Sequence, residues 1–295
     1  MSEAVESQPQ SRPQAETGWE IFVCDEWRAR VLQEITGLDG PPYADGNVPC
    51  PALLPPTFLV AHRTDPAAMG VPDAPVRLNA GNWCRWEAPV MPGEILERRT
   101  VIESVTTKPG RDSELTFYQL ATTYRRRMTH DVVARTSTTT IRTGARQGRG
   151  GSGHRTRPPS DAMPVIEVVP SSREVVRYAA ATDDFYEVHY DHAFARARGL
   201  PGTITHGLLK LAYLARAAVQ WGGRGTFVRE LSASYRGMDR VGAPFRVLAR
   251  ADDGAGDGLS RHLTLYGVSA DGMVSTLGRA VIERTEGEDG QWLRD

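Results

Sequence analysis

A carboxylate and an imidazole lie close together in the second half of the chain, within the run Asp183-Asp184-Phe185-Tyr186-Glu187-Val188-His189. Asp184 and His189 are five residues apart, so a turn can bring both side chains into one small volume. A histidine titrates near neutral pH, and a carboxylate can fix its tautomer or orient the same water. The pair is suited to proton transfer to or from water, although spacing alone favours a solvated polar turn.

A second polar motif, Thr205-His206-Gly207, opens an apolar stretch. If a helix begins at Gly207, its first backbone N–H groups lack intrahelical partners and the helix dipole favours negative charge there. Such an end can bind a thioester carbonyl and stabilise an enolate-like oxygen. Two simpler readings stay open: Thr205 caps the helix, or Gly207 only allows close packing.

Hydrophobic periodicity predicts the elements that must position these groups. From 206 to 221 apolar side chains cover almost the whole circumference of a helix, interrupted by Lys210, Arg216 and Gln220. Such a helix is buried. Segments rich in β-branched and aromatic residues, joined by short loops, follow at 226–236, 244–252, 259–268 and 273–284. They are typical of antiparallel strands, so we expect a sheet curled around one helix.

The first half of the chain runs in the same order, which indicates a diverged duplication. An apolar stretch at 52–60 precedes strand-like segments at 81–89, 94–105, 114–125 and 131–142. Between the halves, residues 143–163 hold five glycines and no large apolar side chain before Met163, as in an exposed linker. We expect a disordered tail at 1–18, a domain at 19–142, the linker at 143–163 and a second domain at 164–295.

Composition excludes several classes of protein. The 35 basic and 36 acidic residues leave a net charge of -1, so we expect no nucleic-acid or membrane partner. Cys24, Cys50 and Cys84 form an odd set without C-x-x-C spacing, which argues against disulfides and zinc and favours the cytoplasm. We expect neither a metal nor a redox cofactor, and we expect Cys84 to be a small buried residue. Surface or packing roles are expected for the remaining histidines, His62, His130, His154, His192 and His262.

Together the motifs resemble the MaoC-like hydratase/dehydratase family, which includes the (R)-specific enoyl-CoA hydratases. The family pattern D-x-N-P-x-H-x-D, followed by a G-x-x-x-H-G helix start, is matched by Asp184, His189, Asp191, Gly202 and His206-Gly207. The first half resembles the degenerate companion domain of two-domain members: 54–58 stands where the second half has its His-Gly, and Tyr43 stands roughly where it has His189. The resemblance implies an α+β double hotdog fold, with two antiparallel sheets each wrapping a central helix.

The resemblance also implies an activity, the reversible hydration or dehydration of a 2-enoyl/(R)-3-hydroxyacyl thioester carried by CoA or by an acyl carrier protein. Asp184 and His189 would be the catalytic pair, and the Gly207 amide would hold the thioester oxygen, with His206 and Tyr186 also at the substrate. Only the second half keeps the full motif, so one active site per chain is implied, with a non-catalytic first half lending walls to the acyl tunnel.

The chain departs from the family where Tyr186-Glu187 replace the usual Asn-Pro. The added carboxylate could raise the pKa of His189 if it lies close. The alternatives to a hydratase are a hotdog-fold acyl thioesterase and a non-catalytic subunit that binds acyl thioesters or carrier proteins. A monomer and a homodimer of such chains fit the prediction equally.

Overall fold

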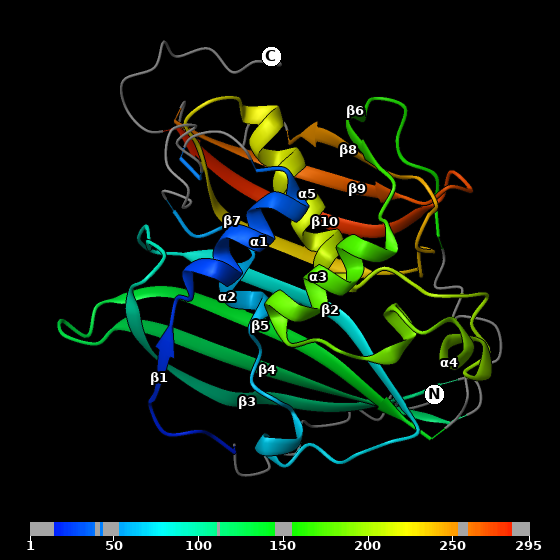
Figure 1. Cartoon of the computed structure of the whole chain (residues 1–295), viewed down its shortest axis with the longest axis horizontal. Coiled ribbons are helices and arrows are strands. Elements are labelled where there is room, and N and C mark those ends of the chain that lie inside the picture. The colour runs from blue at the N-terminus through cyan, green and yellow to red at the C-terminus, as the bar shows by residue number, and fades with distance from the viewer. Residues whose placement is uncertain are drawn as a thin grey trace, which may run out of the picture.

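One continuous antiparallel sheet is the frame of the molecule (Figure 1). The computed structural model describes residues 15–38, 42–43, 53–110, 113–144, 155–252 and 259–284. Its strands are β1 Glu20–Val23, β2 Val76–Trp86, β3 Ile95–Pro109, β4 Glu114–Arg126, β5 Val132–Thr143, β6 Met163–Val168, β7 Thr226–Tyr235, β8 Phe245–Ala251, β9 Ser260–Val268 and β10 Val274–Arg284. The eight strand segments expected from the sequence are all present among them.

The order of the strands confirms the duplication. The sheet runs β1-β3-β4-β5-β2-β7-β10-β9-β8-β6, so each half has the same order from its outer edge to the centre. At the centre β2 pairs with β7, from Gly81 opposite Ser234 to Arg85 opposite Glu230. The expected pair of sheets is therefore a single ten-stranded sheet, because the central strands of the two halves hydrogen-bond to each other.

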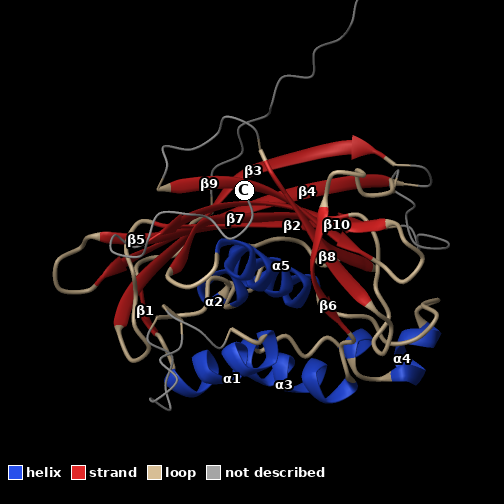
Figure 2. Cartoon of the chain, turned by 90° about the horizontal axis from the view of Figure 1, so that it is seen from above, coloured by secondary structure: helices blue, strands red, loops and turns tan. Residues whose placement is uncertain are grey.

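The helices form two layers on one face of this sheet (Figure 2). Their bounds are α1 Glu26–Thr36, α2 Phe58–Ala61, α3 Ser172–Thr182, α4 His192–Ala197 and α5 Gly207–Gly222, with short 3-10 turns η1 Ala67–Met69 and η2 Glu187–His189. The nearer layer, α5 and α2, lies against the sheet, and α1 and α3 lie beyond it side by side. None of the described helices is long and apolar enough to cross a membrane.

The two central helices differ greatly in length. In the second half α5 has 16 residues and is buried almost all round, as its periodicity predicts. In the first half α2 has only four residues, so the expected central helix is reduced there to one turn. Pro55 and Pro56 lie just before it, and the His62 ring donates to the Phe58 carbonyl at 2.7 Å, in place of a further helical hydrogen bond. The first half therefore covers its part of the sheet with loops.

Both segments expected to be unstructured or exposed are partly built into the fold. At the end of the expected tail, Thr17 donates its N–H to the Thr100 carbonyl on β3 at 2.9 Å. At the end of the expected linker, Val274 donates to the Thr156 carbonyl at 2.9 Å, and Met163 already begins β6. The rest of these segments, 1–14 and 145–154, lies outside the described residues, as do Cys50 and His154.

Candidate active site

Three titratable side chains from the two sequence motifs converge beside the start of α5. The ligand atoms of Asp184, His189 and His206 all lie within 4.8 Å of one another. The rings of His189 and His206 stack with their centroids 3.6 Å apart. The structure thus brings together the carboxylate and the imidazole that the spacing singled out, and adds His206 as their immediate neighbour.

Helix α3 delivers Asp184 to this cluster. Its first turn is closed by a capping box, in which Ser171 accepts from the Glu174 N–H and Glu174 accepts from the Ser171 N–H. The helix ends at Asp183, whose backbone is left-handed with φ 60°. This turn leaves Asp183 exposed and places Asp184 half-buried at the cluster, so Asp184 is the one of the two adjacent carboxylates that lies beside the histidines.

His189 lies at the end of η2 with one ring nitrogen already engaged. Its Nδ1–H donates to the Ile204 carbonyl at 2.8 Å, which leaves Nε2 as the unprotonated nitrogen of the neutral ring. Burial lowers the pKa of His189 and outweighs the opposing effects of the Ile204 hydrogen bond and the Asp184 charge. Glu187 is not among the groups that shift this pKa, so the increase expected from a close Glu187 does not arise, and the His189 ring is neutral near pH 7.

His206 is completely buried and is held in the complementary tautomer. Its Nε2–H donates to the Asp184 backbone carbonyl at 3.1 Å. Burial, followed by the neighbouring His189, lowers the pKa of His206 to about 3, so the ring is neutral. Its Nδ1 and the hydroxyl of Tyr178, whose ring lies 5.1 Å away, have no hydrogen-bond partner among the described residues. Both atoms suit a water or a polar ligand atom.

An arginine from the first half of the chain completes the cluster. Arg63 donates from Nη2 to Asp184 Oδ2 at 3.1 Å, across 121 residues of sequence. Burial is the largest single effect and raises the pKa of Asp184, but Arg63, His206 and His189 together lower it more, with Arg63 the largest of the three, so the net shift is downward. Asp184 is therefore held as a carboxylate. The half expected to lack catalytic residues supplies a charge in direct contact with the carboxylate.

Gly207 begins α5, as the sequence predicts, and lies against an aromatic ring. A methyl group on Gly207 would come within 3.2 Å of the Tyr235 ring. The Tyr235 hydroxyl donates to Asn82 Oδ1 at 2.9 Å, so this contact spans the joint between β7 and β2. The proposed cap is not Thr205: the N-cap residue is His206, without a side-chain cap bond, and Thr205 Oγ1 is unpartnered within the described chain. The first N–H groups of α5 therefore remain open.

A buried ion pair anchors the segment in front of α5. Lys210 donates from Nζ to Asp239 Oδ2 at 2.8 Å, and these side chains are 3% and 5% exposed. Asp239 also accepts from the hydroxyls of Ser269 and Ser275 at 2.5 and 2.7 Å. Its backbone carbonyl accepts from the Thr205 N–H at 2.8 Å. The network thus fixes the residue that precedes the His206-Gly207 pair.

Tyr186 lies at the rim of the cluster. Its ring packs edge-on against His189 with centroids 6.2 Å apart. Arg198 Nη1 donates to the Tyr186 hydroxyl at 3.5 Å, and the Arg77 guanidinium lies 5.7 Å from the ring centroid. The Tyr186 phenol therefore lies between two cationic side chains.

The donor set of the cluster could in principle ligate a metal ion, since one carboxylate and two imidazoles lie within 4.8 Å. The Arg63 guanidinium, however, lies 3.1 Å from the carboxylate. A fixed positive charge at that distance opposes a divalent cation. The electrostatics fit a proton-transfer site better than a metal centre.

A small polar pocket lies next to Arg63, under the inner face of the first half of the sheet. We call it the threonine pocket, and its polar lining consists of Arg63, Thr64, Thr100, Thr122, Thr136, Thr138 and Thr140. Thr100 hydrogen-bonds to Thr64 at 2.7 Å and to Thr122 at 2.9 Å. Arg63 lines this pocket and also contacts Asp184, so the pocket adjoins the cluster of Asp184, His189 and His206.

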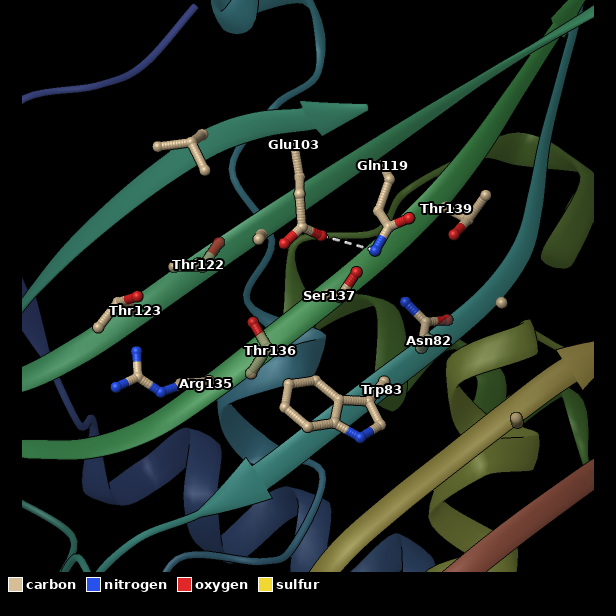
Figure 3. A pocket seen from close by; sticks show the side chains of 14 residues that line it. Asn82, Trp83, Glu103, Gln119, Thr122, Thr123, Arg135, Thr136, Ser137 and Thr139 are labelled. Atoms are coloured by element: carbon tan, nitrogen blue, oxygen red, sulfur yellow. Dashed lines mark hydrogen bonds between the residues drawn. The ribbon is translucent and has the colours of Figure 1, made fainter. Parts of the chain in front are cut away.

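A larger hollow of about 550 Å³ lies over the same strands and opens on the other face of the sheet (Figure 3). Trp83, Glu103, Gln119 and Ser137 point into it, and Gln119 donates to Glu103 at 2.7 Å. None of the site residues expected from the sequence lines it. The hollow is a polar surface feature of the outer face, separate from the cluster.

Sequence reasoning missed Arg63, Tyr178 and the Tyr235–Asn82 contact. No spacing signal connects Arg63 with Asp184, because the contact depends on how the halves pack. The packing role expected for the preceding residue, His62, is confirmed. Its ring is buried, and its two nitrogens lie within hydrogen-bonding distance of the Phe58 carbonyl in the first half and the Ala181 carbonyl in the second. Cys84 is buried as expected, and burial raises the pKa of its thiol to about 12.

Comparisons with known proteins agree with this architecture. Residues 154–258 match the MaoC like domain, and residues 50–135 match the FAS1-like dehydratase domain region. A mesaconyl-C(4)-CoA hydratase of Chloroflexus aurantiacus is 29% identical over 193 residues, which are 60% of this chain and 62% of that protein. The match thus spans less than two thirds of the length of this relative.

Solved structures show the same fold at low identity. A MaoC-like dehydratase superposes with a TM-score of 0.74 at 15% identity, covering 92% of this chain and 98% of that one. A Mycobacterium tuberculosis protein described as having a double hotdog fold gives a TM-score of 0.61 at 14% identity, covering 91% and 97%. The chain therefore has the double hotdog fold of these structures, and residues 154–258, in its second half, match the MaoC like domain.

Proposed function

We propose that the chain catalyses the reversible hydration of a trans-2-enoyl thioester to an (R)-3-hydroxyacyl thioester. The observation that carries this proposal is the placement of Asp184 and His189 beside the open N-terminus of α5 at Gly207. A base and an oxyanion-binding helix end are the two groups that such chemistry needs. The matched relative is named as a hydratase of a CoA thioester, which supports the same reaction class.

In the proposed reaction, Asp184, His189 and Gly207 have different roles. The carboxylate of Asp184 orients a water, and the free Nε2 of His189 accepts its proton as the water oxygen bonds to Cβ. The C2–C3 π electrons shift toward the thioester, whose oxygen gains negative charge and is held by the Gly207 N–H. The proton then passes to Cα, which completes the addition of H and OH; dehydration reverses each step. The second half carries this chemistry, and the first half supports Asp184 through Arg63.

The test follows the ultraviolet absorbance of the conjugated enoyl thioester with a panel of CoA and carrier-bound substrates. Wild-type protein should remove the absorbance, and Asp184→Asn or His189→Ala should lower kcat by about 10²–10⁴-fold. Asp183→Asn is the matched control, because asparagine tolerates the left-handed backbone of this exposed neighbour. Equal activity in Asp184→Asn and Asp183→Asn would refute the site.

Two other outcomes would replace the proposal. Release of free thiol from a saturated acyl thioester, detected with a thiol reagent, would indicate a thioesterase. Thermal stabilisation by acyl thioesters with no turnover of any of them would indicate a binding subunit.

A further inference from the structure

Part of the inner face of the sheet is polar in the first half where the second half is apolar. In the second half, the inner face of β8, β9 and β10 carries Val247, Leu263, Leu265, Ala280 and Ile282, all buried in the core beside α5. In the first half, the corresponding strands β3, β4 and β5 carry the buried threonines of the threonine pocket. The duplicated strands therefore differ in chemistry where the long helix has been lost.

Strand propensity alone does not account for this difference. Threonine is favoured in strands on either face, and Thr123 and Thr139 on the outer face need no other explanation. A buried hydroxyl, however, costs free energy unless it is hydrogen-bonded. Several of them on one buried wall, at Thr100, Thr122 and Thr136, make a surface that suits a polar ligand better than a hydrocarbon one.

The pocket is connected to the reacting centre at two points. Arg63 lines the pocket and contacts Asp184 at 3.1 Å. On the other side, Tyr235 packs on Gly207 and donates to Asn82, which in turn donates to Thr138 in the pocket at 2.9 Å. Because Arg63 joins Asp184 to the pocket, an acyl group with its thioester oxygen at Gly207 and its β-carbon near Asp184 would have the atoms beyond the β-carbon next to the pocket.

The residues that line the pocket also determine which chemical group can occupy it at the end of the acyl chain. A guanidinium has five N–H donors and no acceptor, and within the described residues Arg63 uses only Nη2, toward Asp184. The remaining donors of Arg63 suit an acceptor oxygen, and the hydroxyls of Thr100, Thr122 and Thr140, which already hydrogen-bond within the protein, keep the surroundings of that oxygen polar. The pocket encloses about 20 Å³, enough for one water-sized group and too little for an alkyl chain.

The geometry points to a specificity pocket: the threonine pocket selects short enoyl thioesters whose acyl end carries a hydrogen-bond-accepting oxygen, a hydroxyl or a carboxylate, over hydrocarbon ends of the same size. This inference rests on the proposed hydratase activity. It assigns Arg63 and Thr122 to substrate recognition, in addition to the contact of Arg63 with Asp184.

Two pairs of CoA thioesters of equal size test the inference. One pair is 4-hydroxybut-2-enoyl-CoA against pent-2-enoyl-CoA, and the other is trans-butenedioyl-CoA against 4-methylpent-2-enoyl-CoA. Wild-type kcat/KM should favour the oxygen-ended member of at least one pair by about tenfold. The first pair reports a neutral oxygen and the second an anionic one.

Thr122→Val removes one hydroxyl at nearly constant volume, and Thr123→Val does the same on the outer face of the same strand. Thr122→Val should reduce the preference by about fivefold, and Thr123→Val should leave it unchanged. Preference for the hydrocarbon member in both pairs, or equal effects of the two variants, would overturn the inference. Failure to convert any of the four thioesters, with turnover of longer enoyl thioesters, would overturn this inference alone, whereas turnover of no enoyl thioester at all would refute the hydratase activity itself.

Discussion

The buried Lys210–Asp239 pair gives the sharpest prediction for stability. Lys210→Met should lower the free energy of unfolding by about 3–5 kcal/mol, because it leaves a buried carboxylate without its cation. The two side chains are only 3% and 5% exposed. The hydroxyls of Ser269 and Ser275 would remain on Asp239, and two neutral donors do not replace an ammonium charge at 2.8 Å.

Urea unfolding followed by tryptophan fluorescence measures the effect. With a slope of about 3 kcal/mol per M, the midpoint should fall by about 1–1.7 M. The chain offers a matched control in its one other lysine, Lys108, which is exposed on β3. Lys108→Met should change stability by less than about 0.5 kcal/mol. A loss below about 1 kcal/mol for Lys210→Met would show that the pair contributes no more than a surface ion pair, which contradicts the argument from burial.

Two further predictions concern activity. Arg63→Gln removes the largest charge that lowers the pKa of Asp184, so the acid limb of the pH profile of kcat/KM should move to higher pH. A charge pair worth about 1 kcal/mol or more implies that kcat/KM falls about fivefold at a pH on that limb. An unchanged profile would refute the role of Arg63. Gly207→Ala should lower kcat/KM about tenfold by displacing the Tyr235 ring, whereas Gly144→Ala, with nothing within 4 Å, should not. Equal steady-state rates in both glycine variants would contradict this.

Features with a local signal were predictable from the sequence. Alternating β-branched residues identify β2 to β5 and β7 to β10, and apolar periodicity identifies α5, because both patterns are properties of one segment. The edge strands β1 and β6 and the helix α1 were missed. The edge strands are only four and six residues long. Their pairing depends on a neighbouring strand, and no pattern within such short segments reports it.

The candidate active site likewise contains residues that a local motif predicts and contacts that it does not. Asp184, His189 and Gly207 lie within one motif, so spacing was enough to group them. The contact of Arg63 with Asp184 joins residues 121 positions apart, and it depends on the packing of one half against the other. Lys210 looked like a break in the apolar pattern of α5, yet it is buried because Asp239, from a later loop, neutralises it. Long-range electrostatic partners of this kind leave no local pattern.

The ion pair between Arg63 and Asp184 also bears on how this protein can diverge. After a duplication, the copy without the catalytic motif is usually regarded as free to drift. Here a substitution near Arg63 would alter both the protonation of Asp184 and the lining of the threonine pocket. Under the proposed function, selection can therefore adjust the reaction and its substrate range through the first half, while the motif in the second half stays constant.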